Sequence, residues 1–136
     1  MTTQEYDKIQ TSLHNYTRAL KALEEAVATD PVDGRDYAGI IKSFEFVYEL
    51  AWVTLKRILI AQGHEVQAAR SAFSTSYKLG LLKDEGLWLA MIADRNLTVH
   101  AYDESFSHAL CSRIKDSFMP GFRELASLFA IEIEKF

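Results

Sequence analysis

The segment Asp94–Glu104 carries the densest set of reactive side chains in the sequence. It contains an arginine (Arg95), an amide (Asn96), a histidine (His100), a phenol (Tyr102) and three carboxylates. Apolar patterns typical of helices precede and follow it. Polar, protonatable groups at a junction between buried helices are costly unless they are paired or used. This segment is therefore the candidate site.

These side chains suit chemistry on a phosphodiester. Arg95 is permanently charged and matches phosphate geometry with two donors. His100 can move a proton near neutral pH, Asn96 could hold the imidazole or the backbone, and the Tyr102 hydroxyl could bind phosphate, donate a proton or accept a modification. RNA supplies its own nucleophile, the 2′-hydroxyl, so such a site could cleave RNA without a metal. A two-fold dimer would provide a second histidine.

The spacing sets a geometric condition on this site. Residues five apart lie ~140° apart around an ideal α-helix, so Arg95 and His100 converge only if the backbone leaves helical geometry between them. The β-branched Thr98 and Val99 weaken a helix and mark the expected place.

A purely structural interpretation of the same residues stays open. Arg95 could bridge to an acidic residue of the preceding long helix, for which Glu49 is the preferred partner and Glu45 the other candidate. His100 and Tyr102 could be satisfied capping groups at a helix junction.

The elements that must position this segment are helices. Apolar residues recur at spacings of three and four, with no strand alternation. The predicted helices span residues 6–27, 35–62, 71–79 (from a Ser71 cap to Gly80), 87 into the candidate site, 104–118 (capped by Asp103) and 122–133. A turn is expected at 83–86, and Pro120-Gly121 should kink or break the last helix. The prediction is an all-α, antiparallel up-down four-helix bundle with one or two additional short helices, forming a single domain over residues 1–136.

Composition narrows the function. The net charge of −4 over 136 residues argues against broad binding to nucleic acid. Four basic residues in the middle of the chain are either solvated helix faces or a local RNA-holding surface: Lys56, Arg57, Arg70 and Lys78. The N-terminal residues show no signal-peptide pattern and no window is apolar enough to span a membrane, so a cytoplasmic location without membrane or DNA contact is expected.

Metal and thiol chemistry are not expected. Paired carboxylates in a helical bundle bind metals with a Glu-x-x-His pattern, which Glu45 and Glu49 lack. The histidines outside the candidate site follow no ligand spacing and should lie on the surface: His14, His64 and His108. The single Cys111 is predicted to be a small buried residue. No metal and no cofactor are predicted.

Arg95, His100 and Tyr102 match the R-x4-H-x-Y form of the HEPN superfamily signature. The blocks Phe44–Trp52, Ala72–Leu82, Leu87-Trp88 and Asp94–Tyr102 occur in the order found in its nucleotidyltransferase substrate-binding protein branch. The chain resembles that branch over roughly residues 5–130. The segment Gln67–Ser71 departs from it, since a Ser-Pro-like helix start is expected there.

The resemblance implies a homodimer with the motif at a cleft near the two-fold axis, and a partner, a small separately encoded minimal nucleotidyltransferase, with which it could form a heterotetramer. It also implies the toxin half of a toxin–antitoxin pair, with RNase potential. The catalytic residues would be Arg95, His100, Asn96 and Tyr102, supported by Glu49 and Asp94. Under the alternative, the chain is a non-catalytic presenting subunit whose Tyr102 accepts AMP. It has no nucleotidyltransferase signature of its own.

Overall fold

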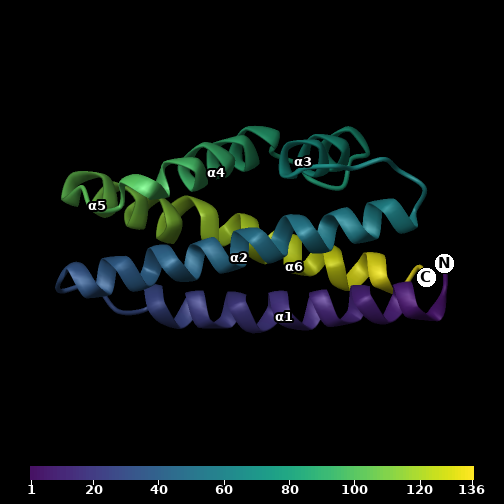
Figure 1. The fold of residues 1–136 in the computed structure, drawn as a ribbon, viewed down its shortest axis with the longest axis horizontal. Coiled ribbons are helices and arrows are strands. Elements are labelled where there is room, and N and C mark those ends of the chain that lie inside the picture. Colours follow the sequence, from purple (N-terminus) through teal and green to yellow (C-terminus); the bar gives the residue numbers. More distant parts are fainter.

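The structure is a computed structural model that describes all 136 residues, and all of its regular elements are helices (Figure 1). The helices are α1 (Thr3–Val27), α2 (Gly34–Ala61), α3 (Ala69–Lys78), α4 (Glu85–Leu97), the 3₁₀ turn η1 (Thr98–His100), α5 (Glu104–Arg113), the π-helical turn η2 (Ile114–Phe118) and α6 (Met119–Ile133). None of them is long and apolar enough to cross a bilayer. The predicted all-α bundle is confirmed.

The two longest helices form an antiparallel hairpin that the remaining helices cover. In Figure 1, α1 and α2 run side by side along the whole length of the molecule. The helix α6 packs against both of them, while α3, α4 and α5 follow one another across α2. The two termini lie together at one end, and the junction between α4 and α5 lies toward the other end (Figure 1).

Local sequence signals fix most helix ends. The Asp33 side chain accepts a hydrogen bond from the amide of Asp36 at the start of α2, and Asp103 does the same for Phe106 at the start of α5. Gly63 follows Gln62, the C-cap residue of α2, with φ = 94°, a conformation that glycine adopts without strain. The predicted roles of Asp103 and Gly63 are confirmed.

Two predicted boundaries were wrong. The helix α3 begins at Ala69, so Ser71 lies inside its first turn, where its Oγ accepts from the amides of Ala68 (3.1 Å) and Gln67 (3.3 Å). Ser71 therefore caps the helix from within. The turn predicted at 83–86 is shorter, because Asp84 caps α4 and the helix starts at Glu85.

We predicted that Pro120-Gly121 would kink or break the last helix. The prediction of a break was wrong. The chain passes from α5 through η2 into α6 without leaving helical geometry. The Met119 amide donates back five residues to the Ile114 carbonyl, which is the wider π pattern. Pro120, which has no N–H to donate, comes directly after this wider turn, at the start of α6.

Aromatic side chains fill the centre of the core. Trp88 of α4 is 2% exposed and stacks on Phe73 of α3 with ring centroids 4.6 Å apart. It meets Phe122 of α6 edge-on at 5.9 Å, and Phe122 lies 6.1 Å from Phe44 of α2. This cluster ties α3 and α4 to the α2–α6 layer, so the helix that carries the candidate site has a fixed base.

Candidate functional site

The candidate site lies where α4 ends. The α-helix gives way at Thr98 to the 3₁₀ turn η1, which is followed by a turn into α5. The predicted departure from α-helical geometry at Thr98-Val99 is thus confirmed. Thr98 is buried, whereas Val99 and His100 are exposed.

Arg95 is held on two sides and remains open to solvent. Its Nη1 donates to Thr98 Oγ1 at 3.0 Å, and its Nη2 lies 3.7 Å from Glu45 Oε2 of α2. The side chain is 35% exposed. A guanidinium has five N–H donors, so donors remain for a ligand.

The preferred ionic partner of Arg95 was predicted wrongly. Glu45 takes that place, while Glu49 accepts a hydrogen bond from Trp52 Nε1 at 3.0 Å. Glu49 and Arg95 nevertheless both act on the buried Tyr48. Burial raises the pKa of the Tyr48 hydroxyl, the Glu49 carboxylate raises it further, and the Arg95 charge lowers it.

His100 and Tyr102 form an exposed pair beyond the helix end. The Tyr102 hydroxyl lies 3.5 Å from His100 Nδ1, and the two rings meet edge to face at 6.0 Å. Tyr102 is 85% exposed. Asn96 is exposed as well, and its side chain makes no hydrogen bond within the protein.

No hydrogen bond or ion pair joins Arg95 to His100 within the chain. A 3₁₀ turn rotates each residue by ~120° instead of the ~100° of an α-helix, so the change of geometry alone does not bring the two side chains onto one face. Their convergence on a ligand stays a prediction.

A partly buried ion pair holds the helix end that carries Arg95. Asp94, which is 8% exposed, accepts two hydrogen bonds from Arg113 of α5, at 2.8 Å from Nε and 2.9 Å from Nη2. Nearby, the buried Ser107 hydroxyl of α5 donates to the carbonyl of Ala101. The ion pair joins α4 to α5, and the Ser107 hydrogen bond joins the intervening turn to α5. Arg113 was missed, because nothing in the sequence links positions so far apart.

The other predicted features can be located. Cys111 is buried, as predicted, and burial raises the pKa of its thiol to about 11. His14 and His108 are exposed, as predicted, and His64 is half-buried. No group of three or more histidine, cysteine or acidic side chains is placed to hold a metal ion.

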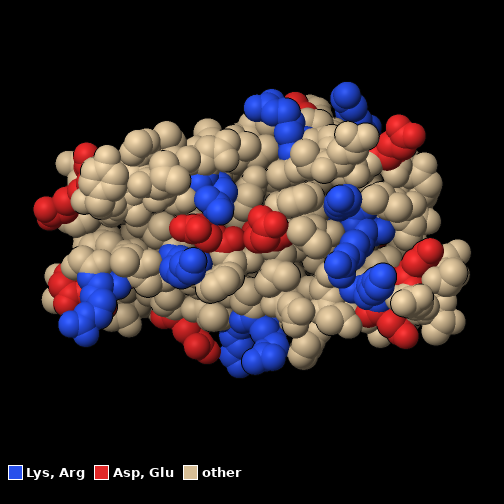
Figure 2. Space-filling model, in the orientation of Figure 1, with Lys and Arg blue, Asp and Glu red and all other residues tan.

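Two of the four middle basic residues, Lys56 and Arg57, make contacts within the chain. Arg57 helps to pack α2 against α1, since its Nη1 donates to Ser12 Oγ at 2.7 Å and to the Lys8 carbonyl at 3.3 Å. Lys56 lies 5.9 Å from the centre of the Trp52 ring. Figure 2 shows a short column of Lys and Arg side chains in the right half of the face, while acidic side chains lie at the centre of the face, beside this column.

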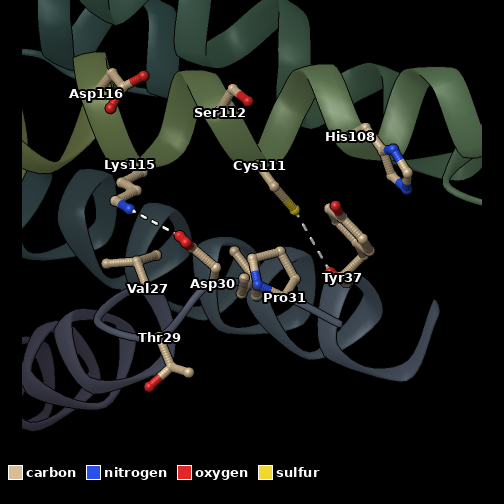
Figure 3. A pocket seen from close by; sticks show the side chains of 11 residues that line it. Val27, Thr29, Asp30, Pro31, Tyr37, His108, Cys111, Ser112, Lys115 and Asp116 are labelled. Carbon is tan, nitrogen blue, oxygen red and sulfur yellow. Dashed lines mark hydrogen bonds and ion pairs between the residues drawn. The ribbon is translucent and has the colours of Figure 1, made fainter. Parts of the chain in front are cut away.

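Hollows open beside the turn between α1 and α2. One of about 340 Å³ lies between that turn and α5, with Tyr37, Cys111 and the ion-paired Lys115 and Asp30 on its walls (Figure 3). A second, of about 410 Å³, includes Ala101 and Tyr102 of the candidate site in its wall. Neither hollow was predicted, because each is formed by segments far apart in the chain.

An all-helical bundle with an exposed R-x4-H-x-Y segment at a helix end has the features of the HEPN class. The chain matches the model of the family described as "Nucleotidyltransferase substrate binding protein like" over residues 11–129. It belongs to that family.

Two individual proteins are also similar. The chain is 32% identical over 84 residues to a protein of Haemophilus influenzae called "Probable ribonuclease HepT", and the match spans 58% of each chain. A crystal structure of a protein from Thermus thermophilus superimposes with a TM-score of 0.73 at 26% identity, covering 87% of this chain and 98% of that one.

Proposed function

We propose that this chain is a HEPN ribonuclease, formed by residues 1–136 as a single domain, and the toxin half of a pair with a small nucleotidyltransferase. The observation that carries the proposal is the exposed helix end at which Arg95 keeps free donors and His100 and Tyr102 face solvent. The family name points to a nucleotidyltransferase partner, and the Haemophilus relative is called a ribonuclease.

The proposed reaction uses the RNA's own hydroxyl. The 2′-oxygen attacks the adjacent phosphorus and the bond to the 5′-oxygen breaks, which leaves a 2′,3′-cyclic phosphate and a 5′-hydroxyl. His100 takes the proton from the 2′-hydroxyl, and Arg95 stabilises the charge on the phosphorane. The departing 5′-oxygen needs a proton, which His100 of a second copy supplies in a two-fold dimer. Asn96 and Tyr102 orient the phosphate.

A growth experiment tests the ribonuclease. Expression of the chain without its partner should slow growth, and His100→Ala should relieve the effect because the proton-transfer group is gone. His14→Ala, a change at an exposed histidine far from the motif in the sequence, is the control and should remain toxic. In vitro, wild type should release 2′,3′-cyclic phosphate ends from RNA. Equal toxicity of wild type and the His100 variant would refute the proposal.

A second candidate function is favoured by the exposure of Tyr102. An 85%-exposed phenol beside an imidazole is accessible to another enzyme. In this function the chain is a non-catalytic subunit: the Tyr102 oxygen attacks the α-phosphorus of ATP held by the nucleotidyltransferase, pyrophosphate leaves, and His100 accepts the phenol proton.

Mass spectrometry tests that modification. Incubation with the co-purified nucleotidyltransferase and ATP should add the mass of one AMP group to the chain. Tyr102→Phe should abolish the adduct, whereas Tyr77→Phe, at another exposed tyrosine, should not. Absence of both the adduct and a stable complex would remove this function.

A further inference from the structure

Most residues that line the hollow of about 410 Å³ beside Tyr102 have no role in the proposed reactions. Three segments form it: the end of the α1–α2 turn with the start of α2, the turn that carries Ala101 and Tyr102, and the first turns of α5. Its volume falls within the range of small-ligand sites. Its lining residues are Val32, Asp33, Gly34, Tyr37, Ala38, Ala101, Tyr102, Glu104, Ser107 and His108.

A stacked aromatic pair forms part of its wall. The rings of Tyr37 from α2 and His108 from α5 lie 3.9 Å apart at 20° (Figure 3). Both residues also line the neighbouring hollow of about 340 Å³, so the pair stands between the two hollows. His108 Nε2 lies 3.7 Å from Glu104 Oε1, and Cys111 Sγ donates to the Tyr37 carbonyl at 3.7 Å. These contacts hold the pair in place on both sides.

The charges of the lining indicate which part of a nucleotide fits. The lining contains the carboxylates of Asp33 and Glu104 and no lysine or arginine, so it disfavours a phosphate group. Carboxylates accept hydrogen bonds from exocyclic base amines, and aromatic side chains including histidine stack on unpaired bases. The phosphate-binding arginine of the proposed site, Arg95, lies outside the hollow, while Tyr102 belongs to both.

We propose that this hollow is a purine-base subsite, in which the base packs on the Tyr37–His108 pair and its amine points to Glu104 or Asp33. The subsite itself is inferred from its lining residues, and only the origin of the base rests on the proposed function. That base belongs either to the RNA nucleotide next to the scissile phosphate or to the AMP group on Tyr102; the chemistry of the subsite is the same.

Binding of free nucleotides to the full-length chain tests the subsite. Titration with AMP and UMP, followed by NMR, should give at least about fivefold tighter binding of AMP, the lower end of what one stacked base contributes, because uracil has one ring and no amine. His108→Ala and Glu104→Gln should each reduce that preference, and both change exposed side chains, so the fold is retained. His14→Ala should bind as wild type does. Equal affinity for AMP and UMP, or an unchanged preference in both variants, would overturn the subsite.

Further experiments distinguish the two sources of the base. They also separate a failure of the subsite from a failure of the proposed function. If the base is part of RNA, wild type should cleave preferentially beside purines, and His108→Ala should lose the preference. If it is the AMP on Tyr102, the adenylated chain should no longer bind free AMP, whereas the unmodified chain should bind it. His100→Ala should bind AMP normally, so loss of the ribonuclease hypothesis would leave the subsite standing. The subsite would be refuted if RNA were cleaved without base preference and the adenylated chain still bound free AMP.

Discussion

The ion pair between Asp94 and Arg113 should contribute more to stability than the charge pairs whose two side chains are both largely exposed. Breaking a fully buried pair costs about 3–5 kcal/mol, and an exposed one about 0–1 kcal/mol. The Asp94 side chain is 12% exposed and the Arg113 side chain 41%, so the pair lies between these limits. We expect Arg113→Ala to lower the free energy of unfolding by about 2 kcal/mol, because it leaves a nearly buried carboxylate without a partner.

Two further experiments separate the effect of the Arg113 charge from the effect of its two-point contact with Asp94. Arg113→Lys keeps the positive charge and loses the two-point contact with bonds of 2.8 and 2.9 Å, so about 1 kcal/mol should be lost, roughly half the effect of truncation. In a double-mutant cycle with Asp94→Asn, the coupling energy should be about 1–2 kcal/mol.

Urea unfolding followed by circular dichroism at 25 °C measures these differences. Lys115→Ala is the matched control, because Lys115 makes the same kind of cross-element pair with an Asp30 carboxylate that is 91% exposed, and its removal should cost less than about 0.5 kcal/mol. The reasoning is refuted if the Arg113 and Lys115 variants lose equal stability, or if the cycle gives no coupling.

Other consequences of the structure can be measured directly. Tyr16→Phe should lower the free energy of unfolding by about 1–2 kcal/mol, because the buried hydroxyl donates to the Phe122 carbonyl at 2.7 Å; urea unfolding checks this, and a change below the error of the method would contradict it. Cys111 should react with a thiol reagent at pH 8 at least ~100-fold more slowly when folded than in urea, since its raised pKa of about 11 leaves about one thiolate in a thousand, and the folded rate should rise with pH up to that value; equal rates would count against the burial. Gly39→Ala should stabilise the chain by about 0.5–1 kcal/mol, because a Cβ there meets nothing within 4 Å inside α2, whereas Gly63→Ala should destabilise it because its φ of 94° is strained for alanine; thermal melts of both variants should shift in opposite directions.

The fold was predictable where a single residue decides a local outcome. Asp103 and Gly63 each act on their own backbone neighbourhood, so their types suffice to place a helix start and a helix end. Ser71 was misplaced because a serine hydroxyl can cap a helix from the position before it or from inside the first turn, and the sequence does not separate the two.

The spacing of apolar residues could have predicted that the last helix is continuous. Phe106, Leu110, Ile114, Phe118 and Phe122 follow one another at intervals of four, and in an ideal α-helix each interval drifts by ~40°. Such a row leaves the core unless a wider turn takes up the excess, and η2 is that turn.

The contacts of the candidate site were less predictable because they depend on how helices rotate against each other. Glu45 and Glu49 are one turn apart on α2, and a shift of one turn decides which of them meets Arg95. Arg113 could not be linked to Asp94 without knowing how α5 returns along α4.

The two tryptophans lie in different environments, so their fluorescence can report on two different regions of the molecule. Trp88 is sealed among Phe73 and Phe122, so its emission should change only when the interior opens. Trp52 is half-buried, donates to Glu49 and lies under Lys56, on the helix whose Glu45 meets Arg95. Replacing either one by phenylalanine would leave a single emitter, Trp88 to follow global unfolding or Trp52 to follow events at the surface, without any attached dye.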